Sequence, residues 1–174
     1  TKVSASPLEG FVPTMKIFNL PYLFKDAAHY QAVLDGPVGQ ELLAAPQTVR
    51  LRGLGYYDAG SRSFYSTERP VYTPEDLTGL KIRVQESQTA LNMVRQLGGS
   101  PTPIAWGELY TALQQGVVDG AENNPPSFYL SKHYEIARYF TLDEHTAVPD
   151  LLLISESVWS QLNTIQQQWL QRAV

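Results

Sequence analysis

Arg83 is the residue of this sequence best placed to bind a negatively charged small molecule. It lies in Lys81-Ile-Arg-Val84, where the alternation of a strand places its two aliphatic neighbours on one face and the arginine on the other. A guanidinium forms two parallel hydrogen bonds with a carboxylate, a geometry that lysine cannot supply. An unpaired buried charge is costly, so Arg83 must have a partner. The sequence leaves two kinds of partner open: an internal salt bridge with Glu86 or Asp119, or the carboxylate of a ligand.

Other polar and aromatic residues lie where predicted strands end or helices begin. Glu86 follows the Arg83 strand, and open α/β sheets bind their ligands at such exits. Trp106 stands at a helix entrance and offers a flat apolar face, with core packing as the alternative. Asn123 follows another strand, where its amide could bind a polar ligand or form a turn before a proline. Arg62 follows the predicted strand 49–57. Together, these polar residues at strand exits predict a ligand cleft.

Enzymatic catalysis has weaker support in the sequence. There is no Gly-x-Ser-x-Gly elbow, phosphate-binding loop, dinucleotide glycine motif or His-Glu-x-x-His, and no histidines or acids stand at metal-ligand spacing. We therefore predict no catalytic residue, no metal and no cofactor, although an enzyme and a pure interaction module stay open as alternatives. The residues that could exchange protons are Glu86, Asp119, Glu122, Glu144, His133 and His145.

Strand and helix signals alternate along the chain, which predicts an α/β fold with largely parallel pairing. The segment 11–24 is apolar but interrupted by prolines, and we expect a buried loop with short turns there. Asp26, Thr73 and Ser87 are expected to cap helices. The predicted strands are 49–57, 81–84, 117–121, 137–141 and 150–155, and the predicted helices are 26–34, a second ending at 43, 87–97, 107–115, 127–133 and a tail from 155 to 174.

Composition excludes several classes of protein. The chain has 174 residues, 13 Lys and Arg against 17 Asp and Glu, and a net charge of −4, so the basic face of a nucleic-acid binder is not expected. No apolar run approaches the length of a membrane span. The absence of cysteine excludes disulfides, thiolate metal sites and cysteine nucleophiles. Both ends are abrupt, which predicts an internal piece of a longer chain.

Three blocks of the sequence resemble the solute-binding proteins of tripartite ATP-independent periplasmic (TRAP) transporters. They are Gly79-Leu-Lys-Ile-Arg-Val-Gln, Gly98-Gly-Ser-Pro-Thr-Pro-Ile-Ala-Trp-Gly-Glu-Leu-Tyr-Thr-Ala-Leu-Gln and Gly116-Val-Val-Asp-Gly-Ala-Glu-Asn. The likeness extends from about residue 11 to 159. It implies a periplasmic receptor of the type II binding-protein fold, in which two α/β lobes joined by a hinge close over an organic acid and deliver it to a membrane permease.

The resemblance also assigns roles to residues. Arg83 would hold the ligand carboxylate, Arg62 would contact it, Asn123 would contribute a hydrogen bond and Trp106 would pack on the ligand. Glu86 takes a position that varies with substrate in the family, and an acid there suits a polyhydroxy ligand better than a dicarboxylate. His145 falls near the rim of the family's pocket.

Gln85-Glu86-Ser87 resembles members that bind hexuronates, so the expected ligand is a hexuronate such as glucuronate or galacturonate. A C4-dicarboxylate, a keto acid and an aldonate are the alternative ligands, and an enzyme acting on sugar acids is the alternative function. Family members carry further sequence at both ends, so we expect an incomplete first lobe, formed by residues 1–59 and 148–174. Residues 60–147 would form the second, ligand-binding lobe. The expected partners are a small carboxylate and the permease, with no nucleic acid and no direct membrane insertion.

Overall fold

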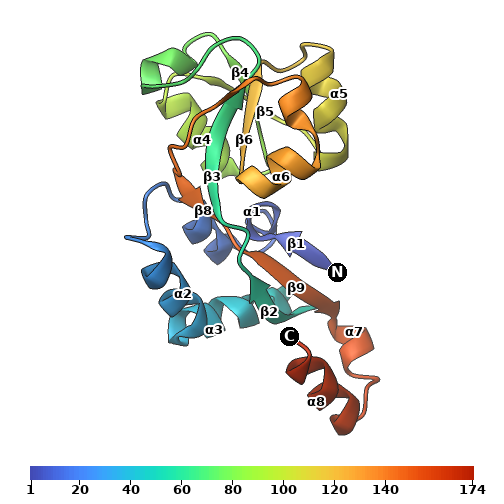
Figure 1. The fold of residues 1–174 in the computed structure, drawn as a ribbon. Helices are drawn as coiled ribbons and strands as arrows, with labels where there is room; N and C mark the ends of the chain where they lie inside the picture. Colours follow the sequence, from blue (N-terminus) through green and yellow to red (C-terminus); the bar gives the residue numbers. More distant parts are fainter.

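The computed structural model describes residues 1–174, and its strands form two separate sheets (Figure 1). One sheet has three strands in the order β1-β9-β2, and the other has six, in the order β5-β4-β6-β3-β7 with β8 beside β3. We call the part around the first sheet the first lobe and the part around the second sheet the second lobe, with the predicted boundaries. The chain passes between them at residues 58–60 and again at 148–149.

The first lobe contains an antiparallel sheet in which β9 lies between β1 and β2. Its core combines residues of the sheet with the segment 5–18 and with two helices, and Met15, Phe18 and Leu34 are among the fully buried side chains. Its elements are β1 (Lys2–Ser4), α1 (Ala5–Leu8), η1 (Pro13–Asn19), α2 (Ala27–Asp35), α3 (Pro37–Ala44), η2 (Ala45–Val49), β2 (Leu51–Tyr57), β9 (Asp150–Ser155), α7 (Glu156–Trp159) and α8 (Thr164–Arg172).

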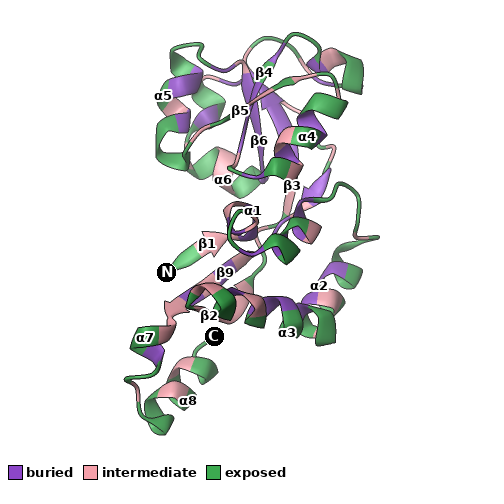
Figure 2. Cartoon of the chain, turned by 180° about the vertical axis from the view of Figure 1, so that it is seen from behind, coloured by how far each residue is buried: buried purple, intermediate pink, exposed green.

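The second lobe buries both faces of its sheet. Phe64 and Tyr65 are neighbours on β3 and therefore point to opposite faces, where each joins a different core cluster. Helix α4 supplies Met93 and Val94 to the first cluster, and α5 supplies Leu109 to the second, so the central strands are buried (Figure 2). The elements are β3 (Ser61–Ser66), η3 (Pro74–Leu77), β4 (Lys81–Val84), α4 (Gln88–Gln96), β5 (Ser100–Pro103), η4 (Trp106–Glu108), α5 (Leu109–Gln114), β6 (Gly120–Asn123), α6 (Pro125–Leu130), η5 (His133–Glu135), β7 (Tyr139–Phe140) and β8 (Thr146–Ala147).

The predicted helix caps are confirmed. Asp26 accepts a hydrogen bond from the backbone N–H of His29, and Ser87 accepts one from that of Ala90, so both satisfy an unpaired donor of the first helical turn. Thr73 forms a capping box with Asp76, although the helix that follows is a single 3₁₀ turn. No helix is long and apolar enough to cross a bilayer.

The prediction of largely parallel pairing is wrong for most strand pairs. Only β4 pairs in parallel, with β5 and β6, and all other pairs are antiparallel. Parallel neighbours need a helical crossover between them, which α4 and α5 supply near β4. The strands of the first lobe come from distant parts of the chain and meet without such crossovers.

The strand β3, on which Arg62 lies, is not among the predicted strands, and several predicted boundaries also differ from the structure. The segment 11–24 contains the 3₁₀ helix η1, and the tail is broken into α7 and α8 because Asn163 caps a new helix with Gln166. The strand expected at 117–121 is β6, three residues later. Val117 and Val118 instead close a turn that follows Gly116 at φ +68°, a left-handed conformation that favours glycine. The shift places Glu122 and Asn123 within the strand rather than after it.

Candidate ligand-binding site

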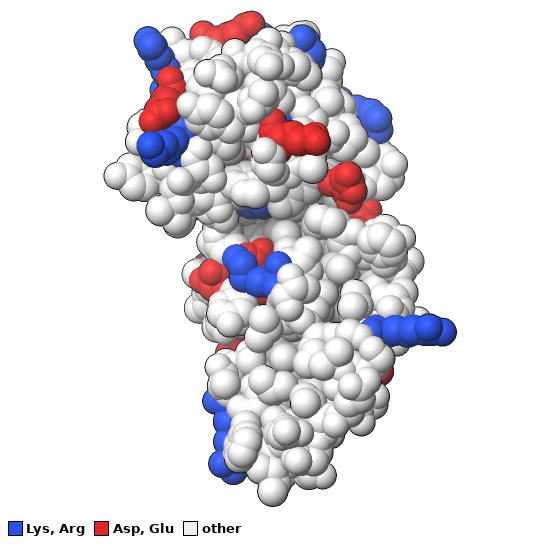
Figure 3. Space-filling view, turned by 90° about the vertical axis from the view of Figure 1, so that its right-hand side faces the viewer, with Lys and Arg blue, Asp and Glu red and all other residues white.

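A cavity of about 470 Å³ lies where the two lobes meet, a size typical of small-molecule sites. We call it the binding cavity. The first lobe contributes Lys2, Val3, Ser4, Pro7 and Asp150 to its lining. Charged side chains of both signs lie together where the two lobes meet (Figure 3). The remaining lining residues are Ala59, Arg62, Arg83, Gln85, Glu86, Ile104, Ala105, Trp106, Asn123, Asn124, Ser127 and Val148.

Arg83 reaches the cavity from β4 and has no acidic partner. Its side chain is 2% exposed, its Nε donates to the carbonyl of Ile104 at 2.8 Å, and its Nη1 has no hydrogen-bond partner. Burial lowers the pKa of Arg83. Neither internal salt bridge left open by the sequence is formed: Glu86 is exposed, and Asp119 accepts from the backbone N–H of Lys81 at 2.7 Å. The structure thus leaves a buried cation with a free donor at the cavity.

Arg62 is buried on β3 and is already neutralised within the protein. Its guanidinium forms a two-point ion pair with Glu122, also bonds the Glu122 carbonyl at 2.8 Å, and donates to Asn123 Oδ1 at 3.0 Å. Burial alone would lower the pKa of Arg62, but the charge of Glu122 outweighs it and the pKa is raised. One of the five N–H donors of Arg62 stays free for a ligand.

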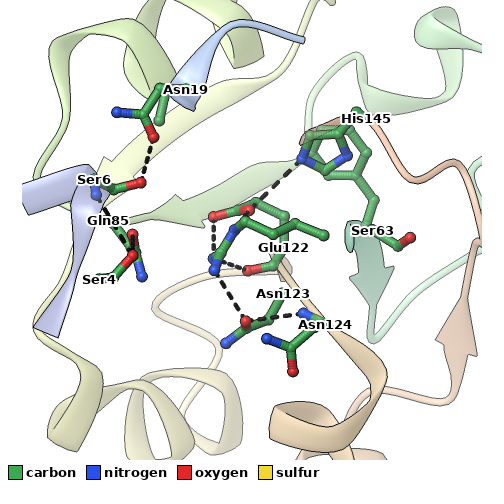
Figure 4. A network of polar contacts seen from close by, with 12 residues as sticks. Ser4, Ser6, Asn19, Ser63, Gln85, Glu122, Asn123, Asn124 and His145 are labelled. Atoms are coloured by element: carbon green, nitrogen blue, oxygen red, sulfur yellow. Dashed lines mark hydrogen bonds and ion pairs between the residues drawn. The ribbon is translucent and has the colours of Figure 1, made fainter. Parts of the chain in front are cut away.

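His145 lies behind this pair and does not line the binding cavity. Its ring is 1% exposed, is stacked on Phe64, and forms a 2.7 Å contact from Nδ1 to Asp143. Its Nε2 is 3.6 Å from Glu122 Oε2, an ion-pair distance rather than a hydrogen bond (Figure 4). Burial lowers the pKa of His145, but Asp143 and Glu122 outweigh that effect and raise it. His145 instead belongs to the lining of a separate cavity of about 380 Å³, together with Tyr22 and Tyr30.

Trp106 and Asn123 present free surface to the cavity. Trp106 is 43% exposed, which does not fit core packing, and the centre of its ring lies 5.7 Å from the Arg83 guanidinium. Behind it, His133 lies 5.3 Å away and is hydrogen-bonded to the Tyr65 hydroxyl. Asn123 uses its oxygen to accept from Arg62 and from the next backbone N–H, which leaves its amide NH₂ unbonded. The turn before Pro125 is capped by Asn124 instead.

Five of the six predicted residues thus line one cavity. Sequence reasoning missed several of its neighbours: Gln85, which would have followed from its place at the exit of β4, and Ser4 and Pro7, for which no sequence signal exists because they come from the other lobe. From the sequence, Glu122 is a group that could exchange protons and that lies near a predicted strand exit. Its pairing with Arg62 depends on the position of β6 beside β3.

The whole chain, residues 1–174, matches the family described as bacterial extracellular solute-binding protein, family 7. The chain belongs to this family. The uncharacterized protein YiiZ of Salmonella typhimurium is 42% identical over 175 residues, which cover 100% of this chain and 54% of that protein. The description of the family is that of solute-binding proteins rather than of enzymes.

Two solved structures of family members superpose closely on the chain. A TRAP periplasmic solute-binding protein from Xanthobacter autotrophicus Py2, with bound β-D-galacturonate, has a TM-score of 0.95 and 44% identity over 99% of this chain and 57% of its own. One from Bradyrhizobium sp. BTAi1, in complex with α/β-D-galacturonate, has a TM-score of 0.96 and 45% identity over the same shares. These superpositions confirm the type II-like fold expected from the sequence. The expected periplasmic location is confirmed at the level of the family. The chain spans about half the length of the curated relatives it matches.

Proposed function

We propose that the protein is the solute receptor of a TRAP transporter and that it binds a hexuronate, such as galacturonate or glucuronate, and delivers it to the membrane permease. The observation that carries the proposal is the buried, unpartnered Nη1 of Arg83 at the cavity between the lobes. A ligand carboxylate would accept a hydrogen bond from this donor and neutralise the positive charge of Arg83. A buried charge without a partner is costly because water cannot solvate it. The galacturonate bound in the two similar structures supports this choice of ligand.

The remaining cavity residues suit the hydroxyl-bearing part of a uronate. The Asn123 amide is a free donor, Glu86 is an exposed acceptor and the Trp106 ring offers a face against which a sugar can pack. Because the lining comes from both lobes, a ligand binds the closed arrangement better and shifts the hinge toward it. The permease would then recognise the closed receptor.

A thermal-shift screen tests this proposal against its alternatives. We expect galacturonate or glucuronate at 100 times its dissociation constant to stabilise the protein by about 2.7 kcal/mol. At this chain size the melting temperature would rise by roughly 5–10 °C. Equal or larger shifts with C4-dicarboxylates, keto acids or aldonates would replace the uronate by that class. Turnover of the uronate on incubation would instead indicate an enzyme.

Glu86 is expected to select hydroxyls over a second carboxylate. Glu86→Gln should weaken galacturonate binding by about 1 kcal/mol, roughly fivefold, because a charged acceptor is lost. The same change should strengthen binding of succinate, since the repelling charge is gone. Calorimetry on both ligands checks the sign of each effect, with Glu75→Gln, on an exposed turn outside the cavity, as the control. A parallel loss for both ligands would contradict a selective role.

A further inference from the structure

Glu9 is a first-lobe residue whose carboxylate is bound almost entirely by the second lobe. It follows α1, whose residues Ala5 and Leu8 are buried in the first-lobe core, so its backbone belongs to that lobe. Its carboxylate accepts hydrogen bonds from the Ser87 hydroxyl at 2.6 Å, the Thr89 hydroxyl at 2.9 Å and the Thr89 backbone N–H at 3.1 Å. Both partners lie at the start of α4, in the other lobe.

The position of Glu9 is fixed from its own side as well. The Asn19 amide donates to Glu9 at 2.9 Å. The oxygen of Asn19 in turn accepts from the Ser6 hydroxyl, and Figure 4 shows this second bond. Asn19 and Ser6 are both buried. The four bonds to one carboxylate therefore extend from the first-lobe core to the first turn of α4.

The Glu9 carboxylate adds a second capping interaction to the N-terminus of α4, supplied by the other lobe. Ser87 is the cap residue of α4 and uses its hydroxyl oxygen for the Ala90 N–H, so Glu9 binds the neighbouring free N–H of Thr89. An anion at this end of the helix also interacts favourably with the helix dipole. Burial alone would raise the pKa of Glu9, but the bonds from Ser87, Thr89 and Asn19 outweigh it, and the pKa is lowered. The group is thus ionised at neutral pH.

A second hydrogen bond from the first lobe holds the segment Gln85–Ser87, which connects β4 to α4. The Ser4 hydroxyl donates to Gln85 Oε1 at 3.1 Å, and both residues line the binding cavity. The turn Gln85–Ser87, which follows Arg83 and carries Glu86, is therefore held by the first lobe on both sides. Without these bonds the turn would have to be ordered when a ligand binds, and that ordering opposes binding.

We propose that Glu9 is a positioning residue of the binding cavity: by capping α4 from the opposite lobe, it sets the relative placement of the lobes and the orientation of the Gln85–Ser87 turn. The effect on affinity rests on the proposed function, whereas the effect on lobe placement does not. Glu9 touches no part of the cavity lining itself and acts through Ser87 and Thr89.

The distance between the lobes can be measured directly, because the chain contains no cysteine. Spin labels at the exposed positions of Gln40→Cys in α3 and Gln96→Cys in α4 report one residue in each lobe. In the ligand-free protein, Glu9→Gln should broaden the distance distribution, Thr89→Val should broaden it less, and Glu9→Asp should restore most of the native width. Glu68→Gln, an exposed acid of the second lobe, should leave it unchanged.

Galacturonate affinity is the second readout. Glu9→Gln should weaken it roughly 2- to 30-fold, the range that follows from the loss of a helix cap. Distributions of equal width in Glu9→Gln, Glu68→Gln and the parent protein would overturn the proposal, and so would a loss of affinity without a change in distance. Failure of the parent protein to bind galacturonate would overturn the ligand assignment alone, since the distance measurement would still decide the role of Glu9. If Glu9→Gln does not fold, the Thr89→Val distribution gives the same decision.

Discussion

Arg83→Lys should abolish uronate binding almost as completely as Arg83→Ala. Truncation of one partner of a buried charged pair costs about 2–5 kcal/mol, which is roughly 30- to several-thousand-fold in affinity. Lysine keeps the charge, but it loses both the planar fork and the Nε–H that donates to the Ile104 carbonyl. Calorimetry with galacturonate measures the effect. Arg95→Lys, an exposed change of the same type on α4, is the control.

Replacing Arg83 should weaken ligand binding without lowering the stability of the ligand-free protein. In the ligand-free protein Arg83 is a buried cation without an ion-pair partner, so Arg83→Met, which fills much of the same volume, should leave the melting temperature unchanged or raise it. The stabilisation by galacturonate should disappear in this variant. A near-native affinity in Arg83→Lys, or a marked loss of ligand-free stability in Arg83→Met, would contradict the role assigned to Arg83.

Glu122→Ala should be among the most destabilising single changes in the chain. It would leave the guanidinium of Arg62 buried without its counter-ion, and breaking a buried pair in this way costs about 3–5 kcal/mol. For a chain of this size the melting temperature would fall by roughly 6–20 °C. Thermal unfolding followed by circular dichroism checks the prediction.

The chain contains a matched control for this change. Arg52 and Glu156 form the same kind of two-point contact, at 3.0 and 2.9 Å, but both side chains are partly exposed. Exposed pairs contribute about 0–1 kcal/mol, so Glu156→Ala should shift the melting temperature by only a few degrees. Equal effects of the two substitutions would show that burial does not govern the Arg62–Glu122 pair.

The pH dependence of stability follows from the same pair. Burial alone would raise the pKa of Glu122, but Arg62 and His145 outweigh it and hold the pKa at about 2. A carboxyl whose pKa is depressed on folding stabilises the protein above its unfolded value, near 4.3, and this contribution is lost as the pH falls toward 2. Urea unfolding between pH 5 and pH 2 should therefore show a steeper loss of stability in the parent protein than in Glu122→Gln.

Much of the second lobe could be predicted from local signals. The caps at Thr73 and Ser87 and the placement of Ile82 and Arg83 on opposite faces of β4 are properties of neighbouring residues, and the structure confirms each. The start of β6 could not be read in this way. Val117 and Val118 have the β-branched side chains of a strand, yet the left-handed Gly116 and the packing of α5 place them in a turn.

For the candidate site, too, some properties follow from the sequence and others only from the tertiary structure. The sequence by itself determined which residues can bind a carboxylate or stack on a sugar, because a guanidinium, an amide and an indole carry their chemistry wherever they are placed. Only the tertiary structure decided their partners: that Arg62 is neutralised by Glu122 while Arg83 is not, that His145 lies behind the pair, and that Glu9 caps a helix of the other lobe. The physical reason is that pairing and burial depend on which strands and lobes meet. The Arg62–Glu122 and Glu9–Thr89 contacts join residues 60 and 80 positions apart, beyond the reach of any local pattern.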